Sequence, residues 1–201
     1  MWHIKDKNIQ RFFLQNIDRL FVVNVLFPTI GSYLKEHGKN NVLNIGFDET
    51  YNIYDRDFFE NDEINFYGLD KDDRYFLPNK WKKIYKLDLT YNLPDKMPKF
   101  DTIIDYGVIG WPGININLNE QQITQYIKNI SLLLETNGLY FLKLDYKYTK
   151  TTNKNHIIKN QSILNIISKF FVQADFYNVS KKTLTQNKDV YYETFVFKLK
   201  N

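Results

Sequence analysis

The length and composition of the chain describe a folded domain of ordinary size. It has 201 residues, of which 43% are hydrophobic, 17% aromatic and 25% charged, a balance too apolar for a disordered chain and too charged for a membrane protein. No apolar run is long enough to span a membrane, and residues 1–15 are too polar for a secretory signal. We therefore expect one soluble, cytoplasmic domain over residues 1–201, with helices in residues 1–40 and the core in residues 41–201.

Cysteine and histidine usage excludes several kinds of chemistry. The chain has no cysteine and three scattered histidines, so disulfides, thiol nucleophiles and cysteine-based zinc sites are absent, and we predict no metal site. The net charge of +4 permits nucleic-acid binding. However, lysine far exceeds arginine, and Asn, Ile, Tyr and Phe are also abundant, so we attribute the basicity to AT-rich codons. No membrane partner is expected.

The first predicted elements are helices. Apolar residues recur at three- and four-residue steps from Ile9 to Leu20, which predicts an amphipathic helix with one buried face. Pro28 is a good first residue for a second, short helix that ends near Gly38.

Short apolar runs follow, each of which ends in a turn or an acidic residue. They are too short for helices and are typical of buried parallel strands. The five runs are Val42–Ile45, Ile64–Leu69, Lys83–Leu87, Asp101–Ile104 and Leu139–Leu144.

The second half of the chain adds two helices and two closing strands. Asn119 is a suitable N-cap for a long helix that Asn137–Gly138 ends, and a further helix is expected from about Asn160 to Phe171. Residues 174–179 and 190–198 are typical of strands, the last one antiparallel. The alternation predicts an α/β fold: an open, mostly parallel seven-stranded sheet with a closing antiparallel strand and helices on both faces.

Four residues mark the carboxyl ends of successive predicted strands: Gly46, Asp70, Asp88 and Asp105. Ligands of open α/β sheets bind at this edge. A glycine after the first strand lets a ligand approach the backbone, and a carboxylate after the second can accept both hydroxyls of a ribose. Asp70 alone is also a common turn or N-cap residue. The regular placement of all four favours a site for a nucleoside-containing cofactor.

From Asn41 to Asn201 the chain resembles the class I S-adenosylmethionine-dependent methyltransferases. The segments that carry the resemblance are VLNIGF, FYGLDKD, YKLDLT, FDTIIDYGVIGW and LLLETNGLYFLKL. The last of these, a helix followed by Asn-Gly and a strand, is similar to the passage before the fifth strand of that family. The resemblance implies a Rossmann-like fold, S-adenosyl-L-methionine as cofactor and methyl transfer as the activity.

The resemblance also implies roles for particular residues. Asp70, with Lys71 after it, would hold the ribose of the cofactor. Asp88 and Leu89 would flank the adenine. The residues after the fourth strand would face the methyl group and the acceptor, namely Asp105, Tyr106 and Gly107.

The first loop departs from the family pattern. Gly46 is followed by Phe47 and Asp48 where the family usually carries further glycines, and Asn44 stands in place of an acid. An asparagine can still bond loop amides. We therefore assign Asn44, Gly46, Phe47 and Asp48 to the cofactor site, while Asp48 is equally well explained as a solvated turn residue.

Methyl transfer requires alignment of the acceptor and the methyl group more than a nucleophile of the protein. A hydroxyl acceptor benefits from a base, and the candidates are Asp105, Asp145 and His156. We place His156 in a polar loop after the fifth strand. Trp111 begins a segment that either walls the acceptor pocket or packs on the next helix. The expected acceptor is a small hydroxylated molecule, such as a sugar or metabolite, rather than RNA.

Other functions remain open. FtsJ-like RNA 2′-O-methyltransferases use a Lys-Asp-Lys-Glu tetrad, which Lys143, Asp105 and Glu193 match in part, with Lys5 or Lys7 as the first lysine. A catalytically inactive binding subunit of the same fold is a further alternative, and the domain could form homo-oligomers. A dehydrogenase is disfavoured, because no G-x-G-x-x-G follows the first strand.

Overall fold

A computed structural model describes most of the sheet and two helices. The described residues are 34, 36, 38, 40–46, 64–71, 82–105, 108–110, 117–147, 154–182 and 189–200. For residues 145–147, 154–158, 175–182 and 189–194 it describes the backbone alone. The amphipathic helix predicted from Ile9 to Leu20 therefore lies outside the described residues, whereas Leu34, within the predicted second helix, is helical and fully buried.

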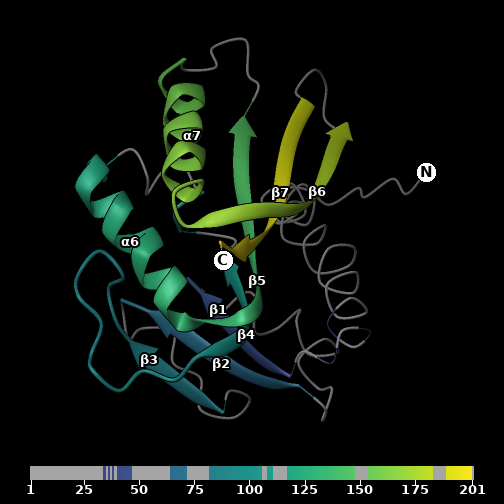
Figure 1. The fold of residues 1–201 in the computed structure, drawn as a ribbon. Helices are drawn as coiled ribbons and strands as arrows, with labels where there is room; N and C mark the ends of the chain where they lie inside the picture. Colours follow the sequence, from purple (N-terminus) through teal and green to yellow (C-terminus); the bar gives the residue numbers. More distant parts are fainter. Residues whose placement is uncertain are drawn as a thin grey trace, which may run out of the picture.

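Seven strands form one sheet in the order β3-β2-β1-β4-β5-β7-β6 (Figure 1). The first five pair in parallel, and β7 runs antiparallel to both of its neighbours. This confirms the predicted sheet, including its antiparallel last strand. The strands are β1 (Asn41–Ile45), β2 (Asn65–Asp70), β3 (Lys83–Lys86), β4 (Phe100–Asp105), β5 (Leu134–Lys147), β6 (Phe171–Lys182) and β7 (Asp189–Leu199).

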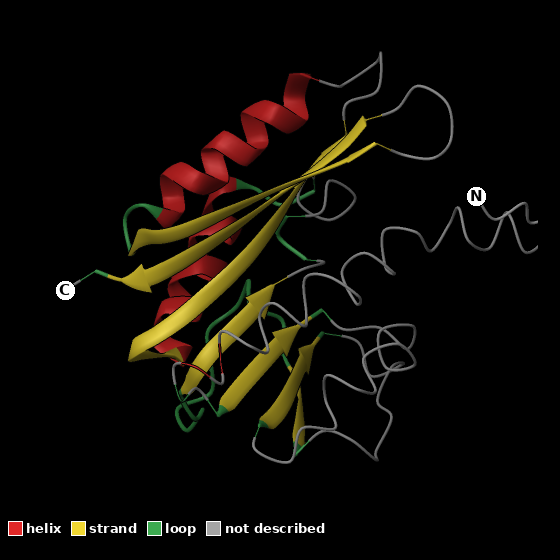
Figure 2. Cartoon of the chain, turned by 90° about the vertical axis from the view of Figure 1, so that its right-hand side faces the viewer, coloured by secondary structure: helices red, strands yellow, loops and turns green. Residues whose placement is uncertain are grey.

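The two described helices, α6 (Glu120–Leu133) and α7 (Lys154–Ile167), lie on one side of the sheet (Figure 2). α6 begins at the predicted cap: the Asn119 side chain accepts from the backbone of Gln122, whose side chain accepts from the backbone of Asn119. Neither described helix is long and apolar enough to cross a membrane.

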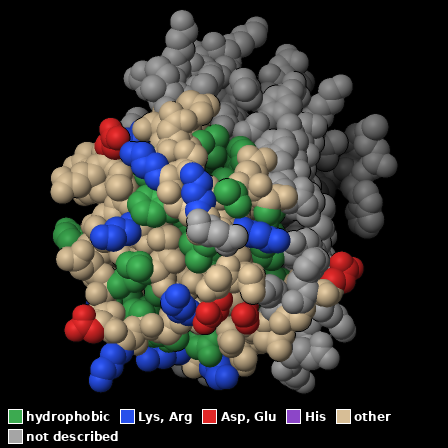
Figure 3. Space-filling view, in the orientation of Figure 1, with side chains coloured by type: hydrophobic (Ala, Val, Ile, Leu, Met, Phe, Trp, Pro, Cys, Tyr) green, Lys and Arg blue, Asp and Glu red, His purple; other side chains and the backbone are tan. Residues whose placement is uncertain are grey.

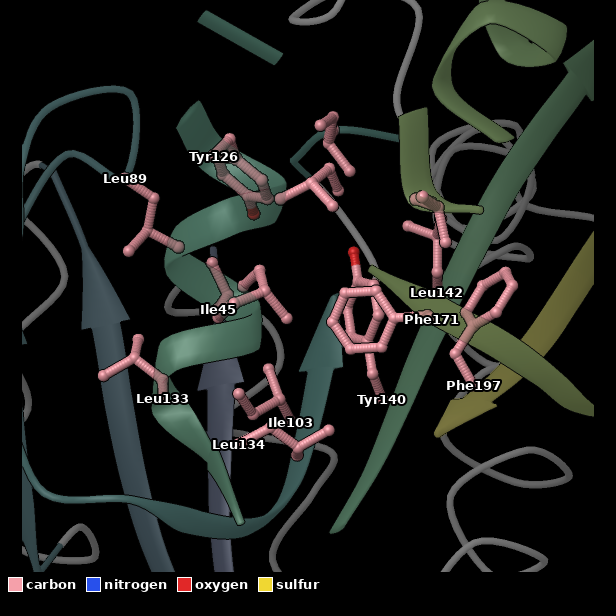
Figure 4. Close-up of a cluster of buried hydrophobic side chains, with 14 of the residues drawn as sticks. Ile45, Leu89, Ile103, Tyr126, Leu133, Leu134, Tyr140, Leu142, Phe171 and Phe197 are labelled. Carbon is pink, nitrogen blue, oxygen red and sulfur yellow. The ribbon is translucent and has the colours of Figure 1, made fainter. Parts of the chain in front are cut away.

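Both faces of the central strands of the sheet are buried. Leu43 and Ile45 of β1 belong to the cluster packed beneath α6 and α7, and Figure 4 shows part of that cluster. Val42 lies on the opposite face by the alternation of strand residues and is buried as well. Phe66, Ile104 and Phe141 are further buried residues outside the helix-side cluster. Burial on both sides explains why the strands are continuous apolar runs.

Three predicted helix boundaries are wrong, namely the end of α6 and both ends of α7. α6 ends at Leu133, because Leu134 adopts extended dihedrals (φ −87°, ψ 137°) and pairs with Phe100 of β4. Asn137 and Gly138 therefore lie within β5 rather than at the end of the helix, next to a register irregularity opposite Phe100.

Both ends of α7 also differ from the sequence expectation. The helix ends at Ile167, and Phe171, its expected end, is the first residue of β6. The helix begins at Lys154 instead of near Asn160, so His156 lies in its first turn and not in a loop. The apolar stripe that predicted this helix starts only at Ile163, and a polar first turn carries no such periodic signal.

The buried hydroxyl of Thr102 provides a stability test. Among the described residues, the Thr102 hydroxyl oxygen is the one buried side-chain nitrogen or oxygen atom without a hydrogen-bond partner. We expect Thr102→Val to raise the free energy of unfolding by about 1 kcal/mol, because the desolvation cost of the hydroxyl disappears. Thr90→Val is the control, since the Thr90 hydroxyl donates to Asp88 and its loss should destabilise. Urea denaturation measures both, and a less stable Thr102→Val protein contradicts the prediction.

Candidate functional site

Gly46 and Asp70 meet at the carboxyl edge of the sheet. β1 and β2 are parallel neighbours, and the Gly46 amide donates to the Leu69 carbonyl at 2.9 Å. Gly46 has φ +69°, a left-handed conformation that favours glycine. This bond places Gly46 beside Asp70, the half-buried last residue of β2. Lys71 follows it and is exposed, and the predicted Phe47 and Asp48 lie outside the described residues.

Asp88 organises a tight turn after β3. Its Oδ1 accepts from the amide and the hydroxyl of Thr90 at 2.9 and 2.7 Å, and its carbonyl accepts from the Tyr91 amide at 3.1 Å. The preceding residue, Leu87, donates its amide to the Asp70 carbonyl at 2.8 Å. The turn is thereby fixed to the end of β2. The Leu89 side chain is buried in the core, so it packs under the edge instead of projecting from it.

A buried asparagine on α6 holds the same turn. Asn129 donates its side-chain amide to the carbonyls of Leu89 (2.8 Å) and Tyr91. Its Oδ1 accepts from Gln125 at 3.0 Å, so every polar group of this side chain is bonded. The turn after β3 is consequently tied to a helix that follows it in sequence by about 40 residues.

Asp105 ends β4 and is fully buried. Its Oδ2 accepts from the hydroxyls of Tyr126 on α6 (2.8 Å) and Tyr140 on β5 (3.3 Å). Its Oδ1 accepts from the Val108 amide at 3.3 Å, and the Ile109 amide also bonds the carboxylate. Burial raises the pKa of Asp105 to about 6, and these four donors limit the rise.

Both tyrosines belong to the helix-side cluster (Figure 4). Burial raises the pKa of each hydroxyl well above its ordinary value, and the nearby negative charge of Asp105 adds to the effect. The charge of Asp70 also contributes to the raised pKa of Tyr126. The carboxylates that end β2 and β4 therefore act on one hydroxyl, although they come from strands separated by β1.

The chain after Asp105 packs closely against β5. Ile109 is fully buried. A Cβ atom on Gly110 would lie 1.7 Å from the Lys143 carbonyl oxygen, so only glycine allows this contact between the two backbones. At the far end of this connection, Leu118 accepts a hydrogen bond from the Lys159 ammonium of α7. Tyr106, Gly107 and Trp111 lie outside the described residues.

Of the partial Lys-Asp-Lys-Glu tetrad, the structure describes the side chains of Asp105 and Lys143, and these two lie on opposite faces of the sheet. Asp105 pairs with Leu142 and faces α6, whereas Lys143 is the next residue of β5 and points to the other face. Glu193 pairs with Leu144, one position from the partner of Lys143. Because adjacent strand residues point to opposite faces, Asp105 and Lys143 do not meet in space. Lys5 and Lys7 lie outside the described residues.

The remaining candidates have scattered positions. Asn44 is buried between Gly68 of β2 and Ile104 of β4, on the face opposite α6. His156 lies in the first turn of α7, and Asp145 lies in β5 opposite Tyr192. The side chains of His156 and Asp145 are not described, so their assignment as bases stays a prediction.

Three residues of the site were missed by sequence reasoning: Tyr126, Asn129 and Tyr140. Tyr126 falls in the predicted helix after Asn119 and Tyr140 in the predicted strand Leu139–Leu144, where an aromatic ring fits the apolar pattern and does not indicate a polar role. The position of Asn129 in the sequence does indicate a polar role, because it lies three residues after Tyr126 and therefore on the same, buried face of α6. A polar side chain on a buried helical face needs partners.

Comparison with known proteins identifies the fold. Neither a family model nor a curated protein sequence matches the chain. A solved S-adenosylmethionine-dependent methyltransferase from Clostridium acetobutylicum has 12% identity and a TM-score of 0.61, covering 96% of this chain and 100% of its own. The N-methyltransferase NodS from Bradyrhizobium japonicum has 13% identity and a TM-score of 0.52, covering 97% and 99%.

A second NodS structure, in complex with S-adenosyl-L-homocysteine, has a TM-score of 0.54 and 11% identity, with coverage of 97% and 90%. StiE O-MT has a TM-score of 0.55 and 13% identity, with coverage of 92% and 77%. At these identities the similarity establishes the fold of this chain.

The raised pKa of Asp105 predicts a specific pH dependence. The folded state holds the Asp105 proton more tightly than the unfolded state, whose value is near 3.8, so this group's stabilisation is complete below about pH 4 and is lost as the pH rises through about 6. A pKa difference of roughly 2 corresponds to about 3 kcal/mol. Asp105→Asn cannot titrate. Wild-type stability minus variant stability, from urea denaturation at pH 4 to 7, should fall with pH, and a constant difference would refute the assignment.

Proposed function

We propose that this chain, whose fold is that of the class I S-adenosylmethionine-dependent methyltransferases, binds S-adenosyl-L-methionine and transfers its methyl group to a small hydroxylated acceptor. One observation carries the proposal. Gly46, Asp70 and Asp88 lie at the carboxyl ends of three neighbouring parallel strands, and these strand ends are tied together by the backbone bonds Gly46 to Leu69 and Leu87 to Asp70. This edge is where open α/β sheets bind nucleotides.

The donors and acceptors at this edge fit the nucleoside of the cofactor. The left-handed conformation of Gly46 allows a ligand to approach the backbone closely. The Asp70 carboxylate can accept both ribose hydroxyls. Asp88 uses Oδ1 within its own turn, and among the described residues nothing bonds Oδ2, which can accept from the amino group of adenine. Asp70 and Asp88 would thus hold two different parts of one ligand.

The bound cofactor supplies a methyl group on a sulfonium centre, and its transfer is an in-line displacement in which alignment accounts for up to roughly 7 to 11 kcal/mol of the barrier. The contribution of the chain is accordingly to position the reactants. Val108, Ile109 and Gly110, held by Asp105 and by β5, form a fixed start to the loop that faces the acceptor in our assignment.

The assignment of a base remains part of the proposal. Asp105 is fully enclosed by donors of its own chain, which suits a group that fixes the loop better than one that meets an acceptor. Asp145 and His156 are the alternative bases for a hydroxyl acceptor. Neither assignment is required for transfer, since positioning supplies most of the effect.

A small acceptor is supported by the distribution of charge. On the face in Figure 3 the described Lys side chains are scattered among neutral and hydrophobic ones, unlike the continuous basic stripe that tracks a nucleic-acid backbone. Asp105 and Lys143 also point to opposite faces of the sheet. The fold itself does not choose the acceptor atom, because its solved examples include an N-methyltransferase and an O-MT.

Asp70→Ala tests the cofactor site. We expect its affinity for S-adenosyl-L-methionine, measured by titration calorimetry, to fall about ten- to a hundredfold, because a charged acceptor of ribose hydrogen bonds is lost. Asp95→Ala removes an exposed carboxylate from a turn beyond β3 and should bind as the wild type does. Equal affinities of a folded Asp70→Ala protein and the wild type would remove Asp70 from the site.

A transfer screen tests the acceptor class. Radiolabelled S-adenosyl-L-methionine is offered with sugars, small hydroxylated metabolites, and capped or structured RNAs, and we expect label in a small hydroxylated product. Lys143→Ala should retain this transfer. Transfer to RNA that disappears in Lys143→Ala would instead support the RNA 2′-O-methyltransferase alternative, and binding without any transfer would support an inactive binding subunit.

A further inference from the structure

Two polar side chains interrupt the buried stripe of α6, and each reaches a different loop at the carboxyl edge. Tyr126 and Asn129 lie three residues apart on one helical face, together with Ile123, Ile127 and Ile130. The Tyr126 hydroxyl bonds Asp105 at the start of the loop after β4. Asn129 bonds the Leu89 and Tyr91 carbonyls in the turn after β3. A single helical turn therefore contacts both loops.

From this geometry we infer that α6 is a brace in which Asn129 positions the adenine-binding turn and Tyr126 positions the loop that faces the acceptor. The inference rests on the proposed function, because it assigns these two loops to the two ends of the cofactor. Asn129 and Tyr126 are positioning residues: they act on the ligand through backbone groups and Asp105, and neither is assigned a contact with the cofactor.

The bonds of Asn129 explain why an amide is needed there. Its two N–H groups face two carbonyls that lie two residues apart, and its oxygen faces the donor of Gln125. No other side chain of this size offers two donors and one acceptor. An aspartate has the same shape but presents only acceptors to the two carbonyls, so Asn129→Asp removes the donors while leaving the volume unchanged.

The turn after β3 carries the Asp88 carboxylate, which we assign to the adenine amino group, so the Asn129 hydrogen bonds affect how this carboxylate is placed. Asp88 and Thr90 bond each other within the turn, and the Tyr91 amide bonds the Asp88 carbonyl. These contacts set the local shape, while the Asn129 bonds are the ones that fix the turn to α6. Without them the Leu87–Asp70 backbone bond would still tie the start of the turn to β2, but the turn would lose its attachment to α6. The Asp88 carboxylate would then be held less firmly, and recognition of the adenine amino group would weaken.

Two variants with separate expected effects test the brace. Hydrogen exchange is measured at the amides of Thr90 and Tyr91 in one loop and of Val108 and Ile109 in the other. Asn129→Asp should accelerate exchange in the first pair, and Tyr126→Phe should accelerate it in the second, each by roughly tenfold for the loss of a buried hydrogen bond. A role confined to global stability would instead accelerate both pairs equally in both variants.

Ligand discrimination gives a second readout. S-adenosyl-L-homocysteine is titrated against S-inosyl-L-homocysteine, in which oxygen replaces the adenine amino group. Asn129→Asp should narrow the wild-type preference for the adenine compound by about tenfold, whereas Tyr126→Phe should leave that preference unchanged. The matched control is Asn165→Asp, which makes the same change in an exposed Gln161–Asn165 pair on α7 and should change neither readout.

The outcomes distinguish the two proposals. If the wild type binds neither compound, the proposed function fails, and hydrogen exchange alone still decides whether α6 fixes the two loops. Two results would refute the brace. One is a wild type that prefers the adenine compound together with an Asn129→Asp protein that keeps the full preference. The other is an Asn129→Asp protein whose Thr90 and Tyr91 amides exchange at the wild-type rate. Should Asn129→Asp not fold, Asn129→Ser serves in its place, because a shorter side chain with one donor loses the bonds without introducing a charge.

Discussion

The burial of the Asp105 carboxylate is the constraint on which the described site depends. A carboxylate removed from water is costly unless donors surround it, and here the donors are two tyrosine hydroxyls and two backbone amides. They come from α6, from β5 and from the loop after β4. None of these donors carries a charge, so the pKa remains raised to about 6. The group is therefore satisfied only when all three elements are in place.

Hydrogen bonds to α6 fix the positions of two loops relative to a packed helix. Loops at functional sites are the segments that vary and move most easily. The turn after β3 and the loop after β4 are both bonded to α6, whose other inward residues pack in the core. Small shifts of either loop would require a shift of the helix against the sheet.

The electrostatics of the edge also suit a cationic ligand. Asp70 and Asp105 end strands on either side of β1, and both act on the pKa of Tyr126. The exposed Lys71 follows Asp70 directly, but the carboxylate of Asp70 is the half-buried group at the strand end. A half-buried charge is screened less by salt than an exposed one. A ligand that combines ribose hydroxyls with a positive sulfonium centre matches both features.

The amino-acid sequence alone predicted the seven strands, a mostly parallel sheet with an antiparallel last strand, the cap of α6 at Asn119, and the polar residues that end the strands. These are local signals: a buried parallel strand is an apolar run, and its end is marked where the run meets Gly46, Asp70 or Asp105. The predicted end of α6 at Asn137–Gly138 failed because Leu134 pairs with Phe100, a contact that no local pattern records.

Which side chains meet depends on the three-dimensional packing of the elements. The hydrogen-bond partners lie far away in sequence, at 21 residues for Tyr126, 40 for Asn129 and 35 for Tyr140. The local sequence around each residue is apolar and does not indicate these bonds. The separation of Lys143 from Asp105 has the same origin. Strand residues alternate between faces, so the pairing register of β4 and β5, and not the presence of both residues in the sequence, decides whether they share a site.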